Sequence, residues 1–378
     1  MIAPSWFPSV PVDFGSASHG KLKADQWRVI GTTYLPVSLV RLWAQSSDDS
    51  PRSTRCKDIL DVTMFLVSAT AIATSRVTSH VNATLFLQHM TAYIEGVKRL
   101  FPTFPLRPNH HMALHLPEYL VQYGPVHAWW LFPFERVIGM LQRTATNCKL
   151  GELEETISRS FTRSANLRNI MQCSGCPDAI RCCRTVFDKL INPRATGSLF
   201  HDIASFSASR QDVHDDSDID DDDRAYEDKR ATAIPSELFE AMKNLYRSPQ
   251  SKGVLLPYTY VGGVLYSINS KHQGNSCALV KVLTDEMPAP CRIEHIIQCK
   301  IGNKVQTLVG VRRYLPFDRP NDPFRAYPFV QARLWSAALG VLEVYHSNSI
   351  SSHFVAYPYE QDAIVAISLN RYICSTNN

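Results

Sequence analysis

One acidic side chain lies beside basic residues in a pattern that could bind a metal ion. Glu135 follows Pro133 at the start of an expected helix, and Arg136 and Arg143 lie on the same helix. Carboxylate oxygens are the ligands that Mg²⁺ and Mn²⁺ prefer, and basic side chains beside such a site suit a phosphate substrate. An acid in the first helical turn is also stabilised by the helix dipole, and it can form an ordinary surface pair with Arg136. The residues alone leave a metal ligand and a surface carboxylate both open.

Further cations follow Glu135 at helical spacing. They are Lys149, Arg159, Arg163 and Arg168. Together with Arg136 and Arg143 they could form a strip that faces DNA phosphates, which is the interpretation we prefer. Alternatively, they are solvated and pair with acids at helical spacing, namely Glu152, Glu154 and Glu155.

The residues just before Glu135 are rich in aromatic rings. They are Trp129, Trp130, Phe132 and Phe134. Such a patch can stack on an unpaired base beside a cleavage site, but most aromatic stripes belong to a hydrophobic core. Trp129 and Trp130 are therefore candidate DNA contacts, with core packing as the alternative.

Four histidines cluster in the same part of the chain: His110, His111, His115 and His127. His111 and His115 are four residues apart, which can place two imidazoles on one helix face for a metal. No Glu lies between them, as it does in the helices of zinc proteases. The histidines either pack at a domain junction, bonded to backbone or carboxylate groups, or they lie beside the active site and contact phosphate.

Ten cysteines are scattered without the spacing of a secreted disulfide framework. Cys173, Cys176, Cys182 and Cys183 could bind zinc, but the adjacent Cys182 and Cys183 do not easily share one tetrahedral site, so buried free thiols are the alternative. Residues 1–16 lack a basic start followed by an apolar run, and the longest apolar stretch, residues 59–73, is too short to span a bilayer. We expect reduced thiols in the cytosol or nucleus, and no membrane partner.

The elements that must position these residues are mainly helical. Apolar residues recur at three- and four-residue spacing between residues 27 and 101. One expected core stripe is Val81, Leu85, Phe86, Met90, Tyr93, Ile94 and Val97. A later helix that begins with the His pair ends at Gly124. Residues 151–171 form an amphipathic helix, whose inward face is expected to be Leu153, Ile157, Phe161 and Leu167.

The composition changes twice towards the C-terminus. Residues 212–228 hold ten acids and one Arg, which gives this segment a charge of −9. Since the formal net charge of the whole chain is +4, all other residues together carry +13. From residue 254, β-branched runs separated by Gly, Pro, Asn and Asp predict a compact β-rich module such as a small barrel. A basic body beside an acidic stretch fits a polyanion-binding protein, although an ordinary solvated surface explains it equally well.

The sequence thus predicts an α+β chain in three parts. A helical region covers residues 1–195, an acidic disordered linker covers residues 196–233, and a short helix with a small β-rich domain covers residues 234–378.

Two tracts resemble the C-terminal half of CACTA (En/Spm-like) cut-and-paste DNA transposases of plants and fungi. The first, SHGKLKADQWRVIGTTYLPVSLVRLW (residues 18–43), looks like the family's Lys-Ser/Ala-x-Asp helix and Leu-Pro tract. The second, HHMALHLPEYLVQYGPVHAWWLFPFERVIGMLQR (residues 110–143), looks like its paired His-Leu units, Gly-Pro-Val, Trp-containing patch and Pro-x-Glu-Arg. NCKLGELEETISRSF continues the likeness, which covers about residues 10–190. The β module resembles the family's trailing domain of unknown function only loosely.

The resemblance implies a ribonuclease-H-like core in the intact enzyme, where two Asp and one Glu hold two divalent cations that activate water or a DNA 3′-hydroxyl. Glu135 would be the third acid, both catalytic and metal-binding, on the last helix of that core. Asp25 looks like part of the helical insertion domain instead. The two aspartates are expected upstream of this chain. Mg²⁺ or Mn²⁺ therefore belongs to the intact transposase, and the isolated chain is expected to bind no cofactor and to be inactive.

The implied partners are transposon-end DNA and a second protomer or transposase subunit, in the nucleus, with no small-molecule substrate. Two alternatives remain open. The chain could be a domesticated nuclear protein that binds DNA or chromatin without nuclease activity, or a decayed remnant with no function.

Overall fold

A computed structural model gives the fold of the chain. It describes residues 1–10, 13–16, 22, 24–44, 50–131, 134–135, 138, 141, 149, 151–172, 176–177, 179–180, 183, 231–246, 249–282, 287–301, 304–317 and 322–370. Two compact units are present, one made of Met1–Ala128 with Ala204–Asn378 and the other of Trp129–Ile203. Of the predicted linker at 196–233, only residues 231–233 lie within the described residues.

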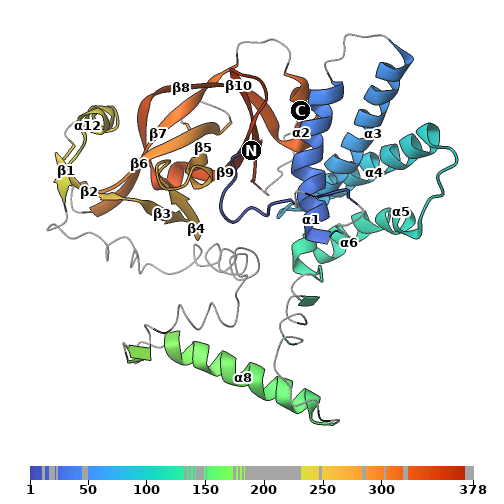
Figure 1. Cartoon of the computed structure of the whole chain (residues 1–378), viewed down its shortest axis with the longest axis horizontal. Coiled ribbons are helices and arrows are strands. Elements are labelled where there is room, and N and C mark those ends of the chain that lie inside the picture. The colour runs from blue at the N-terminus through green and yellow to red at the C-terminus, as the bar shows by residue number, and fades with distance from the viewer. Residues whose placement is uncertain are drawn as a thin grey trace. The chain divides into compact units, whose positions relative to one another are not determined.

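The first unit begins with helices, as predicted (Figure 1). They are α1 (Ala24–Val29), the π-helical turn η2 (Ile30–Tyr34), α2 (Leu35–Trp43), α3 (Pro51–Ala73), α4 (His80–Leu100), α5 (Pro108–Ala113), α6 (Leu116–Tyr123) and the short turn η3 (Val126–Ala128). Ser50 and Ser79 cap α3 and α4, because each hydroxyl accepts a backbone N–H three residues further on. The single helix predicted from the His pair to Gly124 is instead two helices, α5 and α6, but Gly124, with φ of 79°, ends the second one as predicted.

Helices α3 and α4 form an antiparallel pair. Gly96 of α4 lies so close to Val62 of α3 that an added Cβ would stand 2.4 Å from a Val62 methyl. Most of the predicted stripe on α4 is confirmed: Phe86, Met90, Ile94 and Val97 are buried. Val81 was expected on this face but is 54% exposed, because it lies in the first turn of α4.

The C-terminal part is a closed antiparallel barrel, which confirms the predicted β-rich module. Its strands are β5 (Cys277–Val280), β6 (Ala289–Ile301), β7 (Lys304–Pro316), β8 (Ala332–His346), β9 (Ile350–Pro358) and β10 (Ala363–Ser368). They follow one another in the order β6-β5-β9-β10-β8-β7, and β7 pairs with β6 to close the ring. Strands β1 (Thr232–Ala233) and β2 (Lys252–Leu256) extend from β6. Side chains from β5, β7, β8, β9 and β10 meet in one apolar cluster, which fills the barrel.

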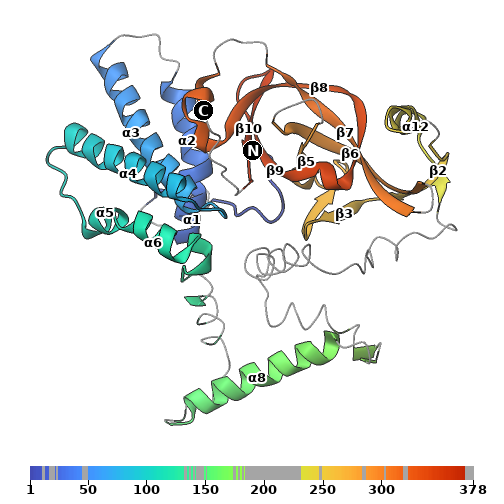
Figure 2. The ribbon, with the colours of Figure 1, turned by 180° about the vertical axis from the view of Figure 1, so that it is seen from behind.

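Two small elements pack on opposite faces of barrel strands β6 and β7. Helix α12 (Ser236–Lys243) lies beside the barrel strands (Figure 2). Its buried Leu238 and Met242 pack with side chains of β6, β7 and β8. The hairpin of β3 (Tyr258–Val261) and β4 (Val264–Ser267) forms a sheet of its own and buries Tyr266 against β5, β6 and β7.

The helices and the barrel share a core within the first unit. Val37 of α2 and Leu60 and Met64 of α3 lie in one buried cluster with Val355 of β9 and Val365 of β10. The N-terminal segment adds a second connection. Residues 1–8 run along the barrel, where Ile2 exchanges two backbone hydrogen bonds with Ala356.

The second unit contains α8 (Leu153–Gln172), which the sequence predicted. The prediction that its apolar face points inward is wrong for Leu153 and Phe161, which are 44% and 43% exposed, and for Leu167. No hydrophobic cluster in the described part of the chain includes these three residues. Among the described helices, none is long and apolar enough to cross a bilayer.

Candidate nucleic-acid interface

The carboxylate singled out by the sequence is exposed. Glu135 lies in a helical turn of the second unit, where its backbone N–H donates to the carbonyl of Leu131 at 2.9 Å. Phe134 and Ile138 beside it are exposed as well. Arg136 and Arg143 lie outside the described residues.

A divalent cation needs several oxygen ligands, and a two-metal site needs carboxylates that bridge or flank both ions. The described residues contain no group of three or more His, Cys, Asp or Glu side chains that could hold a metal. Asp25 belongs to α1 in the other unit, and its side chain is outside the described residues. The residues that the structure describes therefore do not fit the Mg²⁺ or Mn²⁺ that the resemblance implies, and no catalytic step follows from them.

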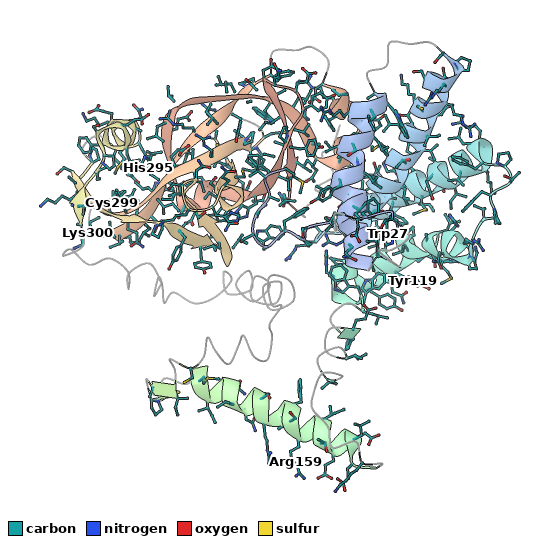
Figure 3. The ribbon with its side chains drawn as sticks, in the orientation of Figure 1. Trp27, Tyr119, Arg159, His295, Cys299 and Lys300 are labelled. Atoms are coloured by element: carbon teal, nitrogen blue, oxygen red, sulfur yellow. The ribbon has the colours of Figure 1, made fainter. Side chains whose placement is uncertain are left out.

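The expected phosphate-facing strip lies on and beside α8, and two of its cations have acidic partners there. Lys149 Nζ is 3.9 Å from Glu152 Oε2, and Arg159 forms an ion pair with Glu155. Figure 3 shows Arg159 projecting from α8. Arg163 is exposed on the same helix, whereas the side chain of Arg168 lies outside the described residues. Exposed pairs of this kind contribute little stability and can exchange for a phosphate partner.

The structure brings His111 and His115 together and gives His110 and His127 other partners. His110 Nδ1 accepts the backbone N–H of Arg107 at 3.0 Å and caps α5. Nε2 of His111 and Nε2 of His115 are 3.4 Å apart, and His115 Nδ1 is 3.8 Å from a Glu118 carboxylate oxygen.

His127 and the two tryptophans stand at the end of the first unit's helices and the start of the second unit. His127 Nε2 lies 2.8 Å from the carbonyl oxygen of Thr74, a bond to backbone of the kind that the sequence left open. His127 also lines a pocket with Arg28 and Gln331. Among the described residues, Gln331 is the single non-glycine residue with a positive φ. Trp129 and Trp130 are half-buried.

The thiols that the structure describes give no zinc site. Cys176 is buried and Cys183 is exposed, while Cys173 and Cys182 lie outside the described residues. In the barrel, burial raises the pKa of Cys277 to about 12 and that of Cys299 to about 11, so both stay protonated and are poor nucleophiles. Figure 3 labels Cys299 on β6.

A basic surface that the sequence analysis missed lies where α3 begins and α4 ends. We call it the α3–α4 basic end. Its cations are Arg52, Arg55, Lys57, Lys98 and Arg99, and its acids are Asp58 and Glu95, which leaves a net charge of +3. The two ends meet because α3 and α4 are antiparallel, and a side chain from each confirms the contact. Arg55 Nη2 donates to the carbonyl of Leu100 at 3.4 Å, and Arg99 Nη1 is 3.5 Å from Asp58 Oδ2.

Local geometry fixes part of this surface. The guanidinium of Arg55 lies over the ring of Phe101, with 5.6 Å between them, so its direction is held by both the ring and the Leu100 carbonyl. The first turn of α3 has no acid, and the positive end of its helix dipole adds to the charge of Arg52. A signal for this surface was present in the sequence, because two long helices joined by a short connection are normally antiparallel.

Comparison with known proteins adds no identity, since no protein-family model, curated protein or solved structure matches the chain.

Proposed function

We propose that this chain binds duplex DNA as a part derived from a cut-and-paste transposase, and that it does not cut DNA by itself. The main observation behind the binding proposal is the α3–α4 basic end, which has five basic side chains and only two acidic ones. The resemblance of residues 110–143 to CACTA transposases supports DNA, and hence the nucleus, over other polyanions.

The charge arrangement suits a phosphate backbone. Duplex DNA carries one negative charge per about 1.7 Å of its axis, and each phosphate neutralised by Lys or Arg releases condensed counterions. A compact group of cations on two helix ends can contact several neighbouring phosphates at once. Such contacts position a protein on DNA but carry no sequence information, so the proposal is for binding that is independent of sequence at this surface.

The experiment is duplex binding as a function of salt, measured by fluorescence anisotropy. In the test variant, Arg52, Lys57 and Lys98 are replaced by Gln, while Arg55 and Arg99 keep their structural contacts. The slope of log K against log salt should become shallower by about 0.9 for each phosphate that the variant no longer neutralises, by the same amount on unrelated duplex sequences.

A matched variant controls for the overall reduction in positive charge. It carries Lys304, Arg325 and Arg333 to Gln, which removes three exposed cations of the barrel part instead. If both variants weaken binding equally, net charge explains the affinity and the α3–α4 basic end has no special role.

Removing negative charge near the same surface should have the opposite effect on DNA binding. Asp48 and Asp49 precede Ser50, the cap of α3, in the sequence; they lie outside the described residues and are not part of the net charge of +3. Asp48→Asn with Asp49→Asn should strengthen duplex binding at low salt and steepen the salt dependence. Unchanged binding would contradict a phosphate contact at this end of α3.

The absence of cutting by the isolated chain is tested with supercoiled plasmid and Mg²⁺ or Mn²⁺. The plasmid should remain intact, because a single carboxylate, Glu135, does not hold two cations. Nicking by the wild type that Glu135→Gln abolishes would overturn this part of the proposal. A domesticated DNA-binding protein would give the same binding results, and the genomic sequence around the locus, with or without inverted repeats, distinguishes it from a transposase.

A further inference from the structure

The β3–β4 hairpin presents two tyrosine rings to solvent. Tyr258 and Tyr260 are 54% and 62% exposed, and their ring centres are 6.3 Å apart at an interplanar angle of 80°. Since side chains alternate along a strand, the residue between them, Thr259, points the other way and is buried. Both tyrosines therefore lie on the solvent face of the hairpin and are not part of a hydrophobic core.

The hairpin is built to hold these rings in place. Gly262 and Gly263 form its two-residue turn with φ of 54° and 74°, the positive values that such tight turns require and that glycine adopts without strain. The four residue pairs of β3 and β4 are in register from Tyr258–Ser267 to Val261–Val264. On the inner face, Tyr266 packs in the buried cluster with β5, β6 and β7, so the outer face is carried by a fixed support.

The stretch of sequence that contains the two rings is basic. No Asp or Glu occurs between Ala241 and Val282, although acids make up 35 of the 378 residues. This segment contains Lys252, Lys271 and Lys281, all of them exposed. Lys271 lies in the turn that follows β4, which a hydrogen bond between Ile268 N–H and the Pro257 carbonyl ties to the start of β3.

The carboxylate of the underlying strand β6 does not cancel this charge. Glu294 Oε1 lies 2.6 Å from Nε of Arg292 on the same strand, so the pair is neutral. The hairpin therefore combines two exposed aromatic rings with a neighbouring lysine, Lys271. A partner that fits must offer flat π-faces and negative charge together, which is the chemistry of unpaired nucleotides, whereas a duplex hides its base faces.

We propose that the outer face of the β3–β4 hairpin binds single-stranded DNA, with bases stacked on Tyr258 and Tyr260 and phosphates near Lys271. This deepens the proposed function, since it rests on DNA as the partner, but it uses different residues from the α3–α4 basic end. The surface would hold the strand exposed next to a broken or opened duplex end.

The test is anisotropy with a labelled oligothymidylate and with an abasic oligonucleotide of the same length and charge. The wild type should bind the oligothymidylate at least about tenfold more tightly than the abasic strand, because stacking needs the base. Tyr258→Ala with Tyr260→Ala should remove that preference and bind both strands equally. Tyr258→Phe with Tyr260→Phe should keep it, because the ring and not the hydroxyl is required.

Two controls separate this idea from folding and from the duplex proposal. Val341→Ala removes another exposed apolar side chain, at β8, and should change neither affinity. Thermal unfolding checks that each variant is folded. A double Ala variant that binds oligothymidylate like the wild type, or a wild type without preference over the abasic strand, refutes the stacking surface. The variant with Gln at Arg52, Lys57 and Lys98 is measured on duplex DNA in parallel. If only the hairpin proposal is wrong, this variant still weakens duplex binding. If both proposals are wrong, neither set of variants changes DNA binding as expected.

Discussion

His353 of β9 gives the sharpest physical test of the barrel. It is 1% exposed, and its ring stacks on Tyr266 with centres 4.0 Å apart. Nδ1 accepts the indole N–H of Trp6 at 3.3 Å, and Nε2 lies 3.3 Å from the carbonyl oxygen of Asn275. Both contacts are satisfied by the neutral ring with its proton on Nε2. Burial lowers the pKa of His353 from 6.5 to about 3, with His272 adding repulsion and the Asn275 carbonyl opposing the shift.

This pKa shift sets a direction for stability against pH. Between the unfolded pKa of 6.5 and the folded pKa of about 3, the unfolded chain holds a proton on His353 that the folded chain does not. The free energy of unfolding therefore falls as pH is lowered through this window, by about 1.4 kcal/mol per pH unit. From pH 6.5 down to about pH 5 the decrease is about 2 kcal/mol. About one pH unit above 6.5 and higher, the ring is neutral in both states and has almost no effect on stability.

The measurement is thermal unfolding at about pH 7.5 and about pH 5, followed by near-UV circular dichroism. For a unit as large as the first one, 2 kcal/mol corresponds to about 3 °C in Tm. His353→Gln keeps a hydrogen-bonding side chain of similar length but does not titrate. The variant will be less stable at both pH values, and its decrease in Tm on acidification should be smaller than that of the wild type by about this amount. His80→Gln, at an exposed position at the start of α4, is the control and should follow the wild type.

Two outcomes would refute this reasoning. If wild type and His353→Gln show the same decrease in Tm on acidification, the imidazole is not held neutral by its surroundings. If the wild type becomes more stable at about pH 5, the ring gains a proton on folding and the sign of the shift is wrong.

Three further changes test the packing. Gly96→Ala should lower the free energy of unfolding by about 1–3 kcal/mol in urea titrations, since its Cβ would stand 2.4 Å from a Val62 methyl. If stability instead increases by about 1 kcal/mol, which is the helix preference of Ala over Gly, the Val62 side chain has moved aside. Gly274→Ala places a Cβ 1.7 Å from the carbonyl oxygen of Ala3, so the N-terminal segment should leave the barrel and become sensitive to limited proteolysis, whereas an unchanged cleavage pattern would contradict that contact. Ser50→Ala removes the cap of α3 and should cost about 1 kcal/mol by the same titration, unless another group takes over the Ser53 N–H.

Much of the secondary structure could be predicted because it depends on neighbours in the chain. The 3.6-residue spacing in α4 correctly gave Phe86 and Met90 as buried, and runs of β-branched residues between Gly and Pro gave the strands of the barrel. The exposed face of α8 shows what hydrophobic periodicity cannot predict. Periodicity marks an apolar face, but it does not show whether anything packs on Leu153 or Phe161.

The candidate interfaces were less predictable. Glu135 stood out through its motif, yet a metal site is a meeting of side chains from several segments, and the described residues bring no such group together. The α3–α4 basic end was missed, because Asp58 and Arg99 are far apart in sequence and become neighbours only when two helices fold back on one another.

By itself, the sequence determined the local features of this protein: where helices begin at Ser50 and Ser79, and where Gly262 allows the chain to turn. Tertiary structure alone decided that residues 1–8 run along the barrel, where the backbone N–H of Ser5 donates to the side chain of Asn275 at 2.8 Å, 270 positions away. It also decided that α2 and α3 share a core with β9 and β10. The physical reason is that caps and turns are satisfied within a few residues, whereas such contacts depend on the shape and burial of two surfaces that meet only in the folded chain.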